Sequence, residues 1–363
     1  MENKFNSTIL VAPLDWGLGH ATRCIPLIKH LQLLGCIVII AAERAQEKLL
    51  KQEFPFLEFV YLPGYRINYA QSRRFFLLAI LFQLPKIYRA IRNEKKWLNN
   101  FINQRSVDSV LSDNRYGLSH AKVKCVFITH QLTVKAPFAF SEKIIQKLNY
   151  KFINKFSACW VPDEEGPVNF AGILSHPKAL PSTPVTYVGG LSRFERKEVL
   201  AKYDLLIVLS GPEPQRTIFE NIMVSEVKMF QGKVLMVRGL PGHKNILPSF
   251  KEVTIINHLS ATEMEMAFNA SEYIISRTGY TTVMDICKLQ KKAILIPTPG
   301  QTEQEYLAGH LYEQGWCLTV SQHEFSLNKA LLQAKTFPFK IPNFKMDYYR
   351  KIIEQLISSL QNG

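Results

Sequence analysis

Short runs of β-branched and other apolar residues alternate along the whole chain with longer stretches in which apolar residues recur at helical spacing. The pattern begins with the apolar run 7–13, a loop that contains glycines, and a stretch 21–34 that has one apolar face and ends at Gly35. Strands and helices that alternate in this way are typical of parallel sheets covered by helices. The sequence therefore predicts an α/β fold.

The alternation occurs in two series, which predicts two domains. A chain of 363 residues is too long for one ordinary domain and suits two domains of about 150–200 residues. A stretch rich in proline and serine at 178–184 separates the two series. We predict an N-terminal domain at 1–183, a C-terminal domain at 184–346 and a terminal helix at 347–363. The expected strands are 7–13, 36–42, 107–112, 125–129 and 159–162, then 203–210, 233–238, 253–256, 273–276 and 293–297.

The composition is that of a globular protein with a sizeable core, because 47% of the residues are apolar and 20% are charged. The apolar run Phe75–Phe82 is far shorter than the roughly 20 residues of a membrane-spanning helix, so we expect none. The N-terminus lacks a secretory signal pattern, so we expect a cytoplasmic protein.

The six cysteines form no C-x-x-C pair, which favours buried reduced thiols over disulfides or zinc ligands.

The net charge of +14 is unevenly distributed. Residues 1–183 carry 24 basic and 13 acidic side chains, whereas residues 184–363 carry 20 and 17. Between Arg66 and Arg105 there are nine basic residues and one acid, Glu94. An anionic surface, which could be nucleic acid, lipid headgroups or a phosphorylated substrate, is therefore expected to face the N-terminal half.

The first loop, which contains Gly17, Gly19 and His20, lies between a predicted strand and a predicted helix. Such a loop is suited to bind an anion, because backbone N–H groups and the helix dipole point toward it. It lacks the third glycine of the dinucleotide fingerprint, although Glu43 lies near the place of a ribose-binding acid. We expect a functional role for His20, the alternative being a solvated surface histidine.

Three loops of the C-terminal half follow predicted strands and are rich in polar groups. They are 210–216, which includes two prolines and Arg216; 276–285, which includes Arg277 and three threonines; and 298–306, which includes Gln304 and Glu305. Ligands of open α/β sheets bind at the carboxyl ends of strands. Many hydrogen-bonding groups and few apolar ones indicate a sugar as the ligand.

These motifs, in this order, resemble the glycosyltransferases with two Rossmann-like domains (GT-B), and in particular family 28. The resemblance extends over nearly the whole chain and depends on Gly17–His20 with Pro26, on Ser276–Asp285, and on Gln304–Tyr306. It implies two Rossmann-like domains that face a central cleft, with the C-terminal helix returning to the N-terminal domain. It also implies transfer of a sugar from a nucleoside diphosphate, expected to be UDP, to an acceptor hydroxyl.

The resemblance implies a donor site in the C-terminal domain. Asp285 stands where the family has a glutamate that holds the nucleotide ribose, and Gln304 matches a residue that contacts hydroxyls of the donor sugar. The loop from Gly211 to Arg216 replaces a glycine-rich loop of the family with one that contains prolines. Arg216 lies in the first helical turn, where binding of a diphosphate would explain it, the alternative being a solvated arginine. The other donor positions are Arg193 near the diphosphate, Arg277 and Gly279 beside the nucleotide, backbone near Ile256 at the base, and Glu305, where the peptidoglycan enzyme has a glutamine.

The implied acceptor site lies in the N-terminal domain, at Gly17, Gly19, Asn114 and Gln131. Inversion at the anomeric carbon needs one general base. His20 is the first candidate for this base, with Asp113 and His130 in reserve. The chain lacks the Asp-x-Asp motif of metal-dependent glycosyltransferases. We therefore expect no metal and no cofactor, with the nucleotide sugar as a co-substrate.

The basic segment adds a membrane hypothesis. Arg73 and Arg74 precede the run Phe75–Phe82, and apolar residues then recur at helical spacing among basic ones up to Leu98. An apolar patch with basic flanks is typical of an interfacial helix. We favour peripheral contact with the anionic inner face of the plasma membrane and a lipid-linked acceptor. An ordinary core helix with a solvated face is the alternative.

Three other functions remain as alternatives. A nicotinamide dehydrogenase would need a complete G-x-G-x-x-G, which neither half contains. A sugar-nucleotide epimerase or a phosphorylase on the same fold would keep the donor site without a lipid-facing patch. A nucleic-acid-binding protein would explain the charge, but no binding module is evident, so we expect no nucleic-acid partner.

Overall fold

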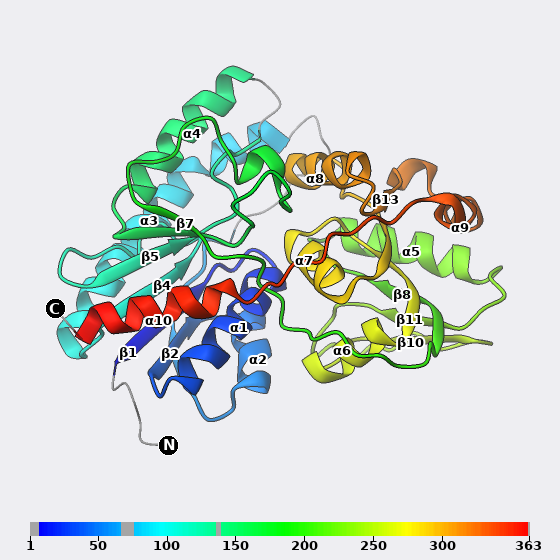
Figure 1. The fold of residues 1–363 in the computed structure, drawn as a ribbon, viewed down its shortest axis with the longest axis horizontal. Coiled ribbons are helices and arrows are strands. Elements are labelled where there is room, and N and C mark those ends of the chain that lie inside the picture. The colour runs from blue at the N-terminus through cyan, green and yellow to red at the C-terminus, as the bar shows by residue number, and fades with distance from the viewer. Residues whose placement is uncertain (1–6, 67–75, 136–138, 362–363) are drawn as a thin grey trace. The chain divides into compact units, whose positions relative to one another are not determined.

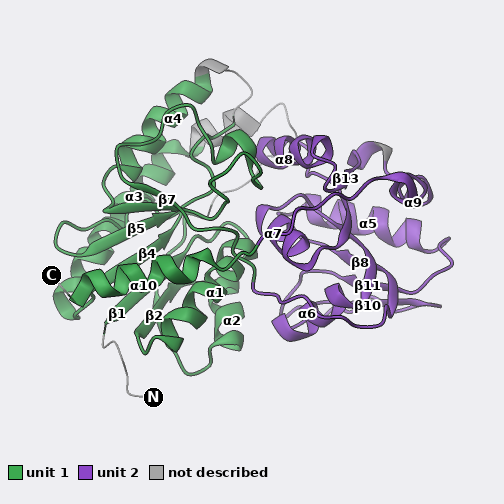
Figure 2. Cartoon of the chain, in the orientation of Figure 1, with its two compact units in different colours: residues 1–68, 77–192, 345–363 green, residues 69–76, 193–344 purple. Residues whose placement is uncertain are grey.

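The computed structural model describes residues 7–66, 76–135 and 139–361, and in 76–82, 139–140 and Glu324 it describes the backbone alone. The chain folds into two compact α/β units (Figures 1 and 2). The first unit comprises the described parts of 1–68, 77–192 and 345–363, and the second comprises 193–344. This architecture confirms the predicted α/β class with two Rossmann-like domains.

The sheet of the first unit has seven parallel strands in the order β3-β2-β1-β4-β5-β6-β7. The strands are β1 (Thr8–Pro13), β2 (Ile37–Ala42), β3 (Glu58–Tyr61), β4 (Ser109–Asp113), β5 (Lys124–Ile128), β6 (Ala158–Val161) and β7 (Val185–Tyr187). Most of the residues in β1, β2, β4 and β5 are buried, as expected for a parallel sheet covered on both faces.

The helices of the first unit are α1 (Leu18–Leu33), α2 (Arg44–Glu53), α3 (Phe76–Gln104), α4 (Ala139–Ile153), the 3-10 turn η2 (Gly172–Leu174) and α10 (Tyr348–Gln361). Helix α1 begins three residues earlier than predicted, so Gly19 and His20 lie in its first turn and not in the loop. Helix α10 lies alongside α1, with Glu354 Oε1 3.3 Å from His30 Nε2 (Figure 1). The C-terminal helix therefore returns to the first unit, as expected.

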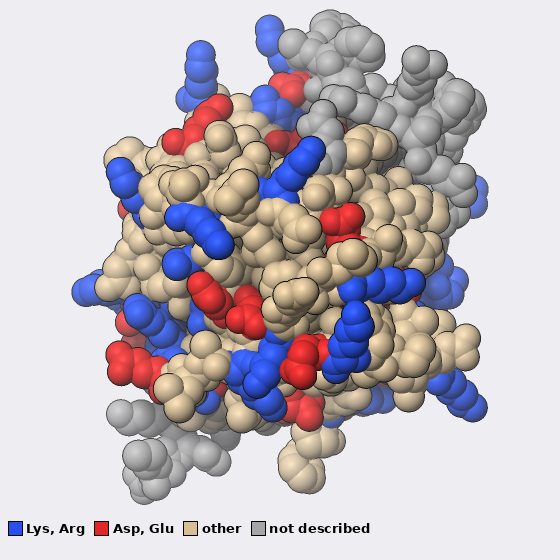
Figure 3. Space-filling view, turned by 90° about the vertical axis from the view of Figure 1, so that its right-hand side faces the viewer, with Lys and Arg blue, Asp and Glu red and all other residues tan. Residues whose placement is uncertain are grey.

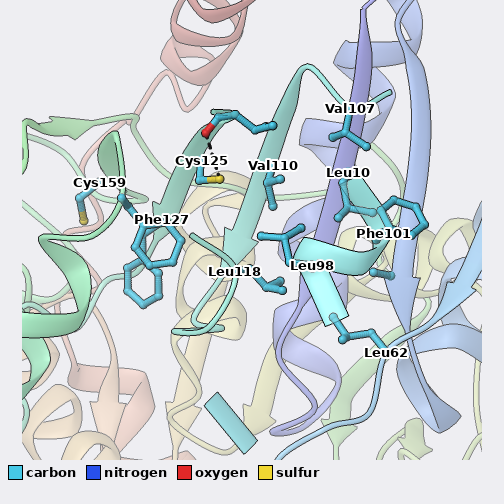
Figure 4. Packing of buried hydrophobic residues seen from close by; sticks show 14 of the residues in the cluster. Leu10, Leu62, Leu98, Phe101, Val107, Val110, Leu118, Cys125, Phe127 and Cys159 are labelled. Atoms are coloured by element: carbon cyan, nitrogen blue, oxygen red, sulfur yellow. Dashed lines mark hydrogen bonds between the residues drawn. The ribbon is translucent and has the colours of Figure 1, made fainter. Parts of the chain in front are cut away.

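One hydrophobic core of the first unit lies between the sheet and α3. Leu98 and Phe101 of α3 pack with Leu10, Val110 and Phe127 of three strands (Figure 4). The six cysteines, all in described parts of the chain, are buried free thiols. One of them, Cys125, donates from Sγ to the carbonyl of Val123 at 3.3 Å. The prediction of buried reduced thiols is confirmed.

The second unit repeats the plan with six parallel strands in the order β10-β9-β8-β11-β12-β13. Its strands are β8 (Tyr203–Val208), β9 (Val234–Val237), β10 (Val253–Ile256), β11 (Ser271–Ser276), β12 (Lys292–Leu295) and β13 (Leu318–Thr319). Its helices are α5 (Gln215–Val227), α6 (Ala261–Asn269), α7 (Tyr280–Leu289), α8 (Thr302–Glu313) and α9 (Leu327–Thr336), with the 3-10 turn η3 (Gln322–Glu324).

The boundary between the units lies later than the predicted 183/184. Strand β7 follows that point and pairs with β6 in the first sheet, with Cys159 opposite Val185. The first unit therefore continues to Ser192, and the second begins at Arg193.

In the described part of the chain, every helix is too short or too polar to cross a membrane, α3 included. The charges of the surface are mixed on the face drawn in Figure 3, where basic and acidic side chains are interspersed.

Candidate functional site

Each sheet has one point at which the strand order reverses. In the first unit this switch point lies between β1 and β4, and in the second it lies between β8 and β11. Ligands of open α/β sheets bind outside the carboxyl ends of strands at such points. His20 follows β1 and Asp113 ends β4, while Gly211 follows β8 and Arg277 follows β11. Both predicted sites therefore begin at a switch point.

In the first unit, His20 and Asp113 lie in contact. Asp113 is fully buried, and its Oδ2 lies 3.2 Å from Nδ1 of His20, whose side chain is 15% exposed. Arg23, one turn further along α1, donates from Nε to the same Oδ2 at 2.8 Å and from Nη2 to Oδ1. Arg23 and Asp113, the two neighbours of His20, thus form a buried ion pair beneath its partly exposed imidazole.

The environment of Asp113 decides its role. Burial alone would raise the pKa of Asp113, but Arg23 and His20 outweigh burial and lower the pKa to about 2. Asp113 is therefore ionised at neutral pH. Because it is also fully buried and already paired, it is suited to orient His20 and poorly suited to the reserve role of accepting a proton from a substrate.

His130 joins the same group through Arg23. Nη1 of Arg23 lies 3.1 Å from Nδ1 of His130, which follows β5 and is 4% exposed. Sequence reasoning missed Arg23, because it looked like one residue of an amphipathic helix. The sequence feature that could have identified Arg23 was its charge, because it lies among the apolar residues of the predicted helix face.

The predicted acceptor positions lie around this group. Gly17 is the N-cap of α1 with a φ of 85°, and its carbonyl accepts a bond from Gln46 Nε2 at 3.2 Å. A residue with a side chain would be strained at that φ. Asn114 has a φ of 56° and donates its N–H to the carbonyl of Ile128. Gln131 donates its N–H to Thr129 Oγ1 at 3.0 Å.

Two carboxylates fasten the segment 61–66 next to the start of α1. Asp15 accepts N–H bonds from Tyr65 and Arg66 at 2.8 and 2.9 Å. Glu43 accepts from Gly64 N–H at 2.9 Å and from Arg66 Nη2 at 2.9 Å. Glu43 is thus engaged within the protein and does not serve as the ribose-binding acid of a dehydrogenase.

In the second unit, Arg277 is a buried guanidinium, 1% exposed. It donates to the carbonyls of Gln215, Ile296 and Pro297 at 3.0 to 3.4 Å, and its guanidinium lies 4.1 Å from the ring centre of Phe219. Among the described residues it forms no ion pair with a carboxylate, and its Nε has no hydrogen-bond partner. Burial lowers its pKa to about 10. Arg277 is therefore an uncompensated positive charge at the switch point.

Of the other buried polar atoms without a hydrogen-bond partner in the described structure, three follow strand ends of this sheet. They are Oγ1 of Thr278 after β11, Oγ1 of Thr298 after β12 and Oε1 of Gln322 after β13. A Cβ on Gly211 would lie 3.8 Å from Thr298 Oγ1, so the loop after β8 approaches the loop after β12. Unpaired buried polar groups are costly, and their gathering at one edge indicates a place for a polar ligand.

The N-terminus of α7 lies at the same edge. Its N-cap is Gly279, and no described side chain caps it. An uncapped helix N-terminus next to a buried arginine is suited to hold an anion, because the helix dipole and the guanidinium have the same sign.

Arg216 differs from the expectation of a diphosphate ligand. It donates to Glu213 at 2.5 Å, to Glu220 at 2.8 Å and to Thr217 at 2.7 Å. Glu220 also accepts two bonds from Arg238, at 2.7 and 3.0 Å. The three guanidinium nitrogens of Arg216 are thus engaged by two carboxylates and one hydroxyl of the protein, and this residue is corrected from a ligand to a structural role.

Gln304 and Glu305 turn back onto the loop that precedes α8. Gln304 Oε1 accepts from Thr298 N–H at 2.9 Å, and Glu305 Oε1 accepts from Gly300 N–H at 3.0 Å. The other predicted donor positions are Asp285, buried on α7; Ile256, half-buried at the end of β10; and Arg193, whose guanidinium lies 4.8 Å from the ring centre of Phe194.

A groove of about 1060 Å³ lies at the opposite, amino edge of the second sheet, between residues that include Tyr203, Lys233 and Val253. It contains none of the predicted site residues. This groove has no comparable group of buried, unpaired polar atoms in the described structure. The candidate sites therefore lie at the carboxyl edges of the sheets and not in this groove.

Comparison with known proteins supports the resemblance. Residues 206–350 match the glycosyltransferase family 28 C-terminal domain. The chain is 28% identical over 145 residues to a UDP-N-acetylglucosamine–N-acetylmuramyl-(pentapeptide) pyrophosphoryl-undecaprenol N-acetylglucosamine transferase of Haemophilus ducreyi, over 38% of this chain and 40% of that protein. It is 21% identical to the protein of the same description from Buchnera aphidicola, over 85% of this chain and 83% of that protein. The match to the Haemophilus protein thus spans less than half of that relative's length.

Solved structures share the fold at low identity. The spinosyn forosaminyltransferase SpnP has a TM-score of 0.60 at 14% identity, covering 97% of this chain and 99% of its own. MurG of Acinetobacter baumannii has a TM-score of 0.54 at 13% identity, covering 99% of this chain and all of its own. At such identities the likeness shows the fold, which is that of GT-B glycosyltransferases.

Proposed function

We propose that this protein is a glycosyltransferase similar to those of family 28, which transfers a sugar from a nucleoside diphosphate to an acceptor hydroxyl. The observation that carries the proposal is the group of buried, unpaired polar atoms at the carboxyl edge of the second sheet, beside the uncompensated charge of Arg277. A diphosphate would supply acceptors to the Thr278 and Thr298 hydroxyls and a negative charge to the guanidinium. UDP is the expected carrier, since the relatives described above are named for a UDP-sugar donor.

The donor site would act on the leaving group. As the bond between the anomeric carbon and the diphosphate breaks, negative charge develops on the departing oxygen. Preorganised donors and a helix N-terminus stabilise such charge without reorganisation. The N-terminus of α7, Arg277 and the two threonine hydroxyls are the groups we assign to this task, in place of a metal. Asp285, Gln304, Gly279 and Arg193 keep the donor-binding roles implied by the resemblance.

The acceptor site would supply the base. Nε2 of His20 takes the proton of the acceptor hydroxyl, and the oxygen then attacks the anomeric carbon from the face opposite the diphosphate, which inverts that centre. The nucleoside diphosphate departs with the electron pair of the broken bond. Asp113 holds Nδ1 of the imidazole, as the short contact between them supports. A base of this kind contributes about 10²–10⁴ in rate.

We further propose that the acceptor is lipid-linked and that the enzyme docks on the cytoplasmic face of an anionic membrane. The run Phe75–Phe82 lies outside the described side chains. The described parts of α3 and α4 support the hypothesis, because Leu84, Tyr88, Ile144 and Leu148 are each 44% or more exposed. Exposed basic residues share these helices, namely Lys86, Arg89, Arg92, Lys143, Lys147 and Lys151. The relatives are named for a pyrophosphoryl-undecaprenol acceptor, which is lipid-linked.

Calorimetry with UDP, GDP and dTDP tests the donor site. We expect one preferred nucleotide, bound roughly tenfold more weakly by Thr298→Val, since one hydrogen bond contributes about 1–1.5 kcal/mol. Failure of the native protein to bind any of the three would overturn the proposal. A product assay with the sugar nucleotide alone separates the epimerase alternative, because an epimerase converts it without an acceptor and a transferase does not.

A further inference from the structure

Three strands of the second sheet, β11, β12 and β13, end side by side. Ser276 of β11 pairs with Leu295 of β12, which pairs with Thr319 of β13. After each strand, a residue with a buried, unpaired polar atom follows two or three positions later. These residues are Thr278, Thr298 and Gln322. They therefore follow one another along the carboxyl edge, and because neighbouring strands are about 4.8 Å apart, the row is roughly 10 Å long.

Gln322 differs from the two threonines in the ligand group that can satisfy it. Its side chain is 8% exposed, and its Nε2 donates to Oε1 of Gln215 at 3.5 Å, whereas its own Oε1 has no hydrogen-bond partner in the described structure. A threonine hydroxyl can donate a hydrogen bond to a phosphate oxygen. An amide carbonyl oxygen can only accept, and the oxygens of an ionised diphosphate offer it no proton. A diphosphate alone would therefore leave Oε1 of Gln322 unpaired.

The contacts of Gln215 connect Gln322 with the candidate donor site. Gln215 is the first residue of α5, which follows the loop after β8. Its side-chain Oε1 accepts from Gln322, and its carbonyl accepts from Nη2 of Arg277 at 3.0 Å. One residue thus contacts both the amide of Gln322 and the buried guanidinium that is expected to meet the diphosphate.

The length of the row decides which part of a nucleotide sugar meets Gln322. A diphosphate spans about one interval between strands, so it can occupy the positions after β11 and β12 but not the one after β13 as well. The base is expected near Ile256 of β10, which lies at the opposite end of the sheet from β13. The part of the ligand that continues from the diphosphate toward β13 is therefore the transferred sugar, whose polar groups can donate hydrogen bonds.

We propose that Gln322 is a specificity-determining residue, whose Oε1 accepts a hydrogen bond from a hydroxyl or amide N–H of the transferred sugar. This inference rests on the proposed function and extends it, because the sequence motifs placed no ligand contact after β13. A sugar without a hydrogen-bond donor at the matching position would leave a buried carbonyl unpaired. The site would therefore discriminate against such a sugar.

Calorimetry tests the contact with the nucleoside diphosphate that the native protein prefers, expected to be UDP, and with its glucose, galactose and N-acetylglucosamine conjugates. We expect Gln322→Leu to bind the free nucleotide as the native protein does. It should bind the preferred sugar nucleotide roughly threefold to tenfold more weakly, as for the loss of one hydrogen bond. Gln322→Met, which has an unbranched side chain of similar length, takes its place if Gln322→Leu does not fold.

Asn269→Leu is the matched control, because Asn269 is a buried amide of the same unit with both ends paired. Its Nδ2 donates to the carbonyls of Glu195 and Glu265 at 3.0 Å, and its Oδ1 accepts from Lys197 N–H at 2.9 Å. This variant should lose stability and keep both nucleotide affinities.

Two results with the Gln322 variants would overturn the inference. Equal weakening of the free nucleotide and the sugar nucleotide would place the contact on the ribose or the phosphates, and unchanged affinity for both would show that Gln322 makes no contact with the ligand. Either result leaves the proposed function standing. Failure of the native protein to bind any nucleotide is the separate result that overturns the proposed function itself.

Analogues of the preferred sugar nucleotide identify the group that Gln322 recognises. Each analogue carries fluorine in place of one polar group of the sugar, and fluorine cannot donate a hydrogen bond. The native protein should bind one of them more weakly than the parent compound, and Gln322→Leu should bind that analogue and the parent equally. Full discrimination by Gln322→Leu against every analogue that the native protein rejects would contradict a contact between Oε1 and the sugar.

Discussion

Pro13 at the end of β1 pairs with Asp113 at the end of β4 across the switch point of the first sheet. This register places the start of α1, which follows β1, directly over the carboxylate that ends β4. His20 and Asp113 are 93 residues apart in the chain and meet for this reason. In the second sheet, Ser276 at the end of β11 pairs with Val208 at the end of β8. The loops that follow these two strands therefore also begin side by side.

Removal of the unpaired hydroxyls should lower nucleotide affinity without lowering the free energy of unfolding. Thr278→Val and Thr298→Val replace a buried hydroxyl without a partner by a methyl group, so the free energy of unfolding should stay level or rise, while nucleotide affinity falls. Thr183→Val is the control, because the Thr183 hydroxyl donates to the carbonyl of Ile153 at 3.2 Å. That variant should lose about 1 kcal/mol of stability and keep its nucleotide affinity. Denaturant unfolding and calorimetry measure the two quantities, and a comparable loss of stability in all three variants would contradict the assignment.

Replacement of His20 should affect turnover alone. His20→Asn keeps a polar side chain of similar shape, and we expect a loss of about two to four decades in kcat with unchanged nucleotide affinity. Lys29→Ala, which alters an exposed side chain further along the same helix, should leave kcat near its native value. Near-native turnover of His20→Asn would transfer the role of base to another group, with His130 as the next candidate.

The ion pair of Asp113 predicts an acid-sensitive contribution to stability. Since its pKa is lowered to about 2 in the folded protein, the ionised form is favoured by folding. The contribution is present above the ordinary pKa of about 3.9 and is lost as the pH falls toward 2, with a magnitude of about 2 kcal/mol. Denaturant unfolding between pH 2 and 6 measures it. In Asp113→Asn this pH dependence should be missing, and an unchanged slope in that variant would show that Asp113 is not the group involved.

Membrane docking should depend on charge and on the exposed apolar residues. Native protein should sediment with vesicles that contain anionic lipid and not with neutral ones, and added salt should weaken the binding. Leu84→Ser with Tyr88→Ser should release it without unfolding, because both side chains are exposed. Leu332→Ser, at an exposed position of the second unit, is the control. Binding to neutral and anionic vesicles alike would argue against docking through the basic helices.

Much of the fold could be predicted from local pattern. The buried strands and the helices after them appear as apolar runs and helical spacing, so the α/β class and the two series followed directly. The missed strands, β3, β7 and β13, have four residues or fewer. Runs that short show no distinct period, and the omission of β7 moved the predicted boundary nine residues too early.

The candidate site was predicted only in part. Strand-end loops identified His20, Asp113, Arg277 and Gln304, because a residue that follows a parallel strand must lie at the carboxyl edge of the sheet. Arg216 was assigned to the ligand, although it pairs with Glu213 and Glu220. Spacing cannot show whether the partner of an arginine is a ligand or a carboxylate of the same protein.

The sequence by itself therefore determined the elements and the edge of each sheet to which a polar residue belongs, since periodicity and strand ends are local properties of the chain. Only the tertiary structure decided which of these residues meet. Arg23 contacts Asp113 across 90 positions because β1 and β4 are neighbours, and the hydroxyls of Thr278 and Thr298 lack partners because the surrounding loops offer none in the described structure. The partner of a buried polar group depends on which strands become adjacent, and that order is settled by the packing of the whole sheet.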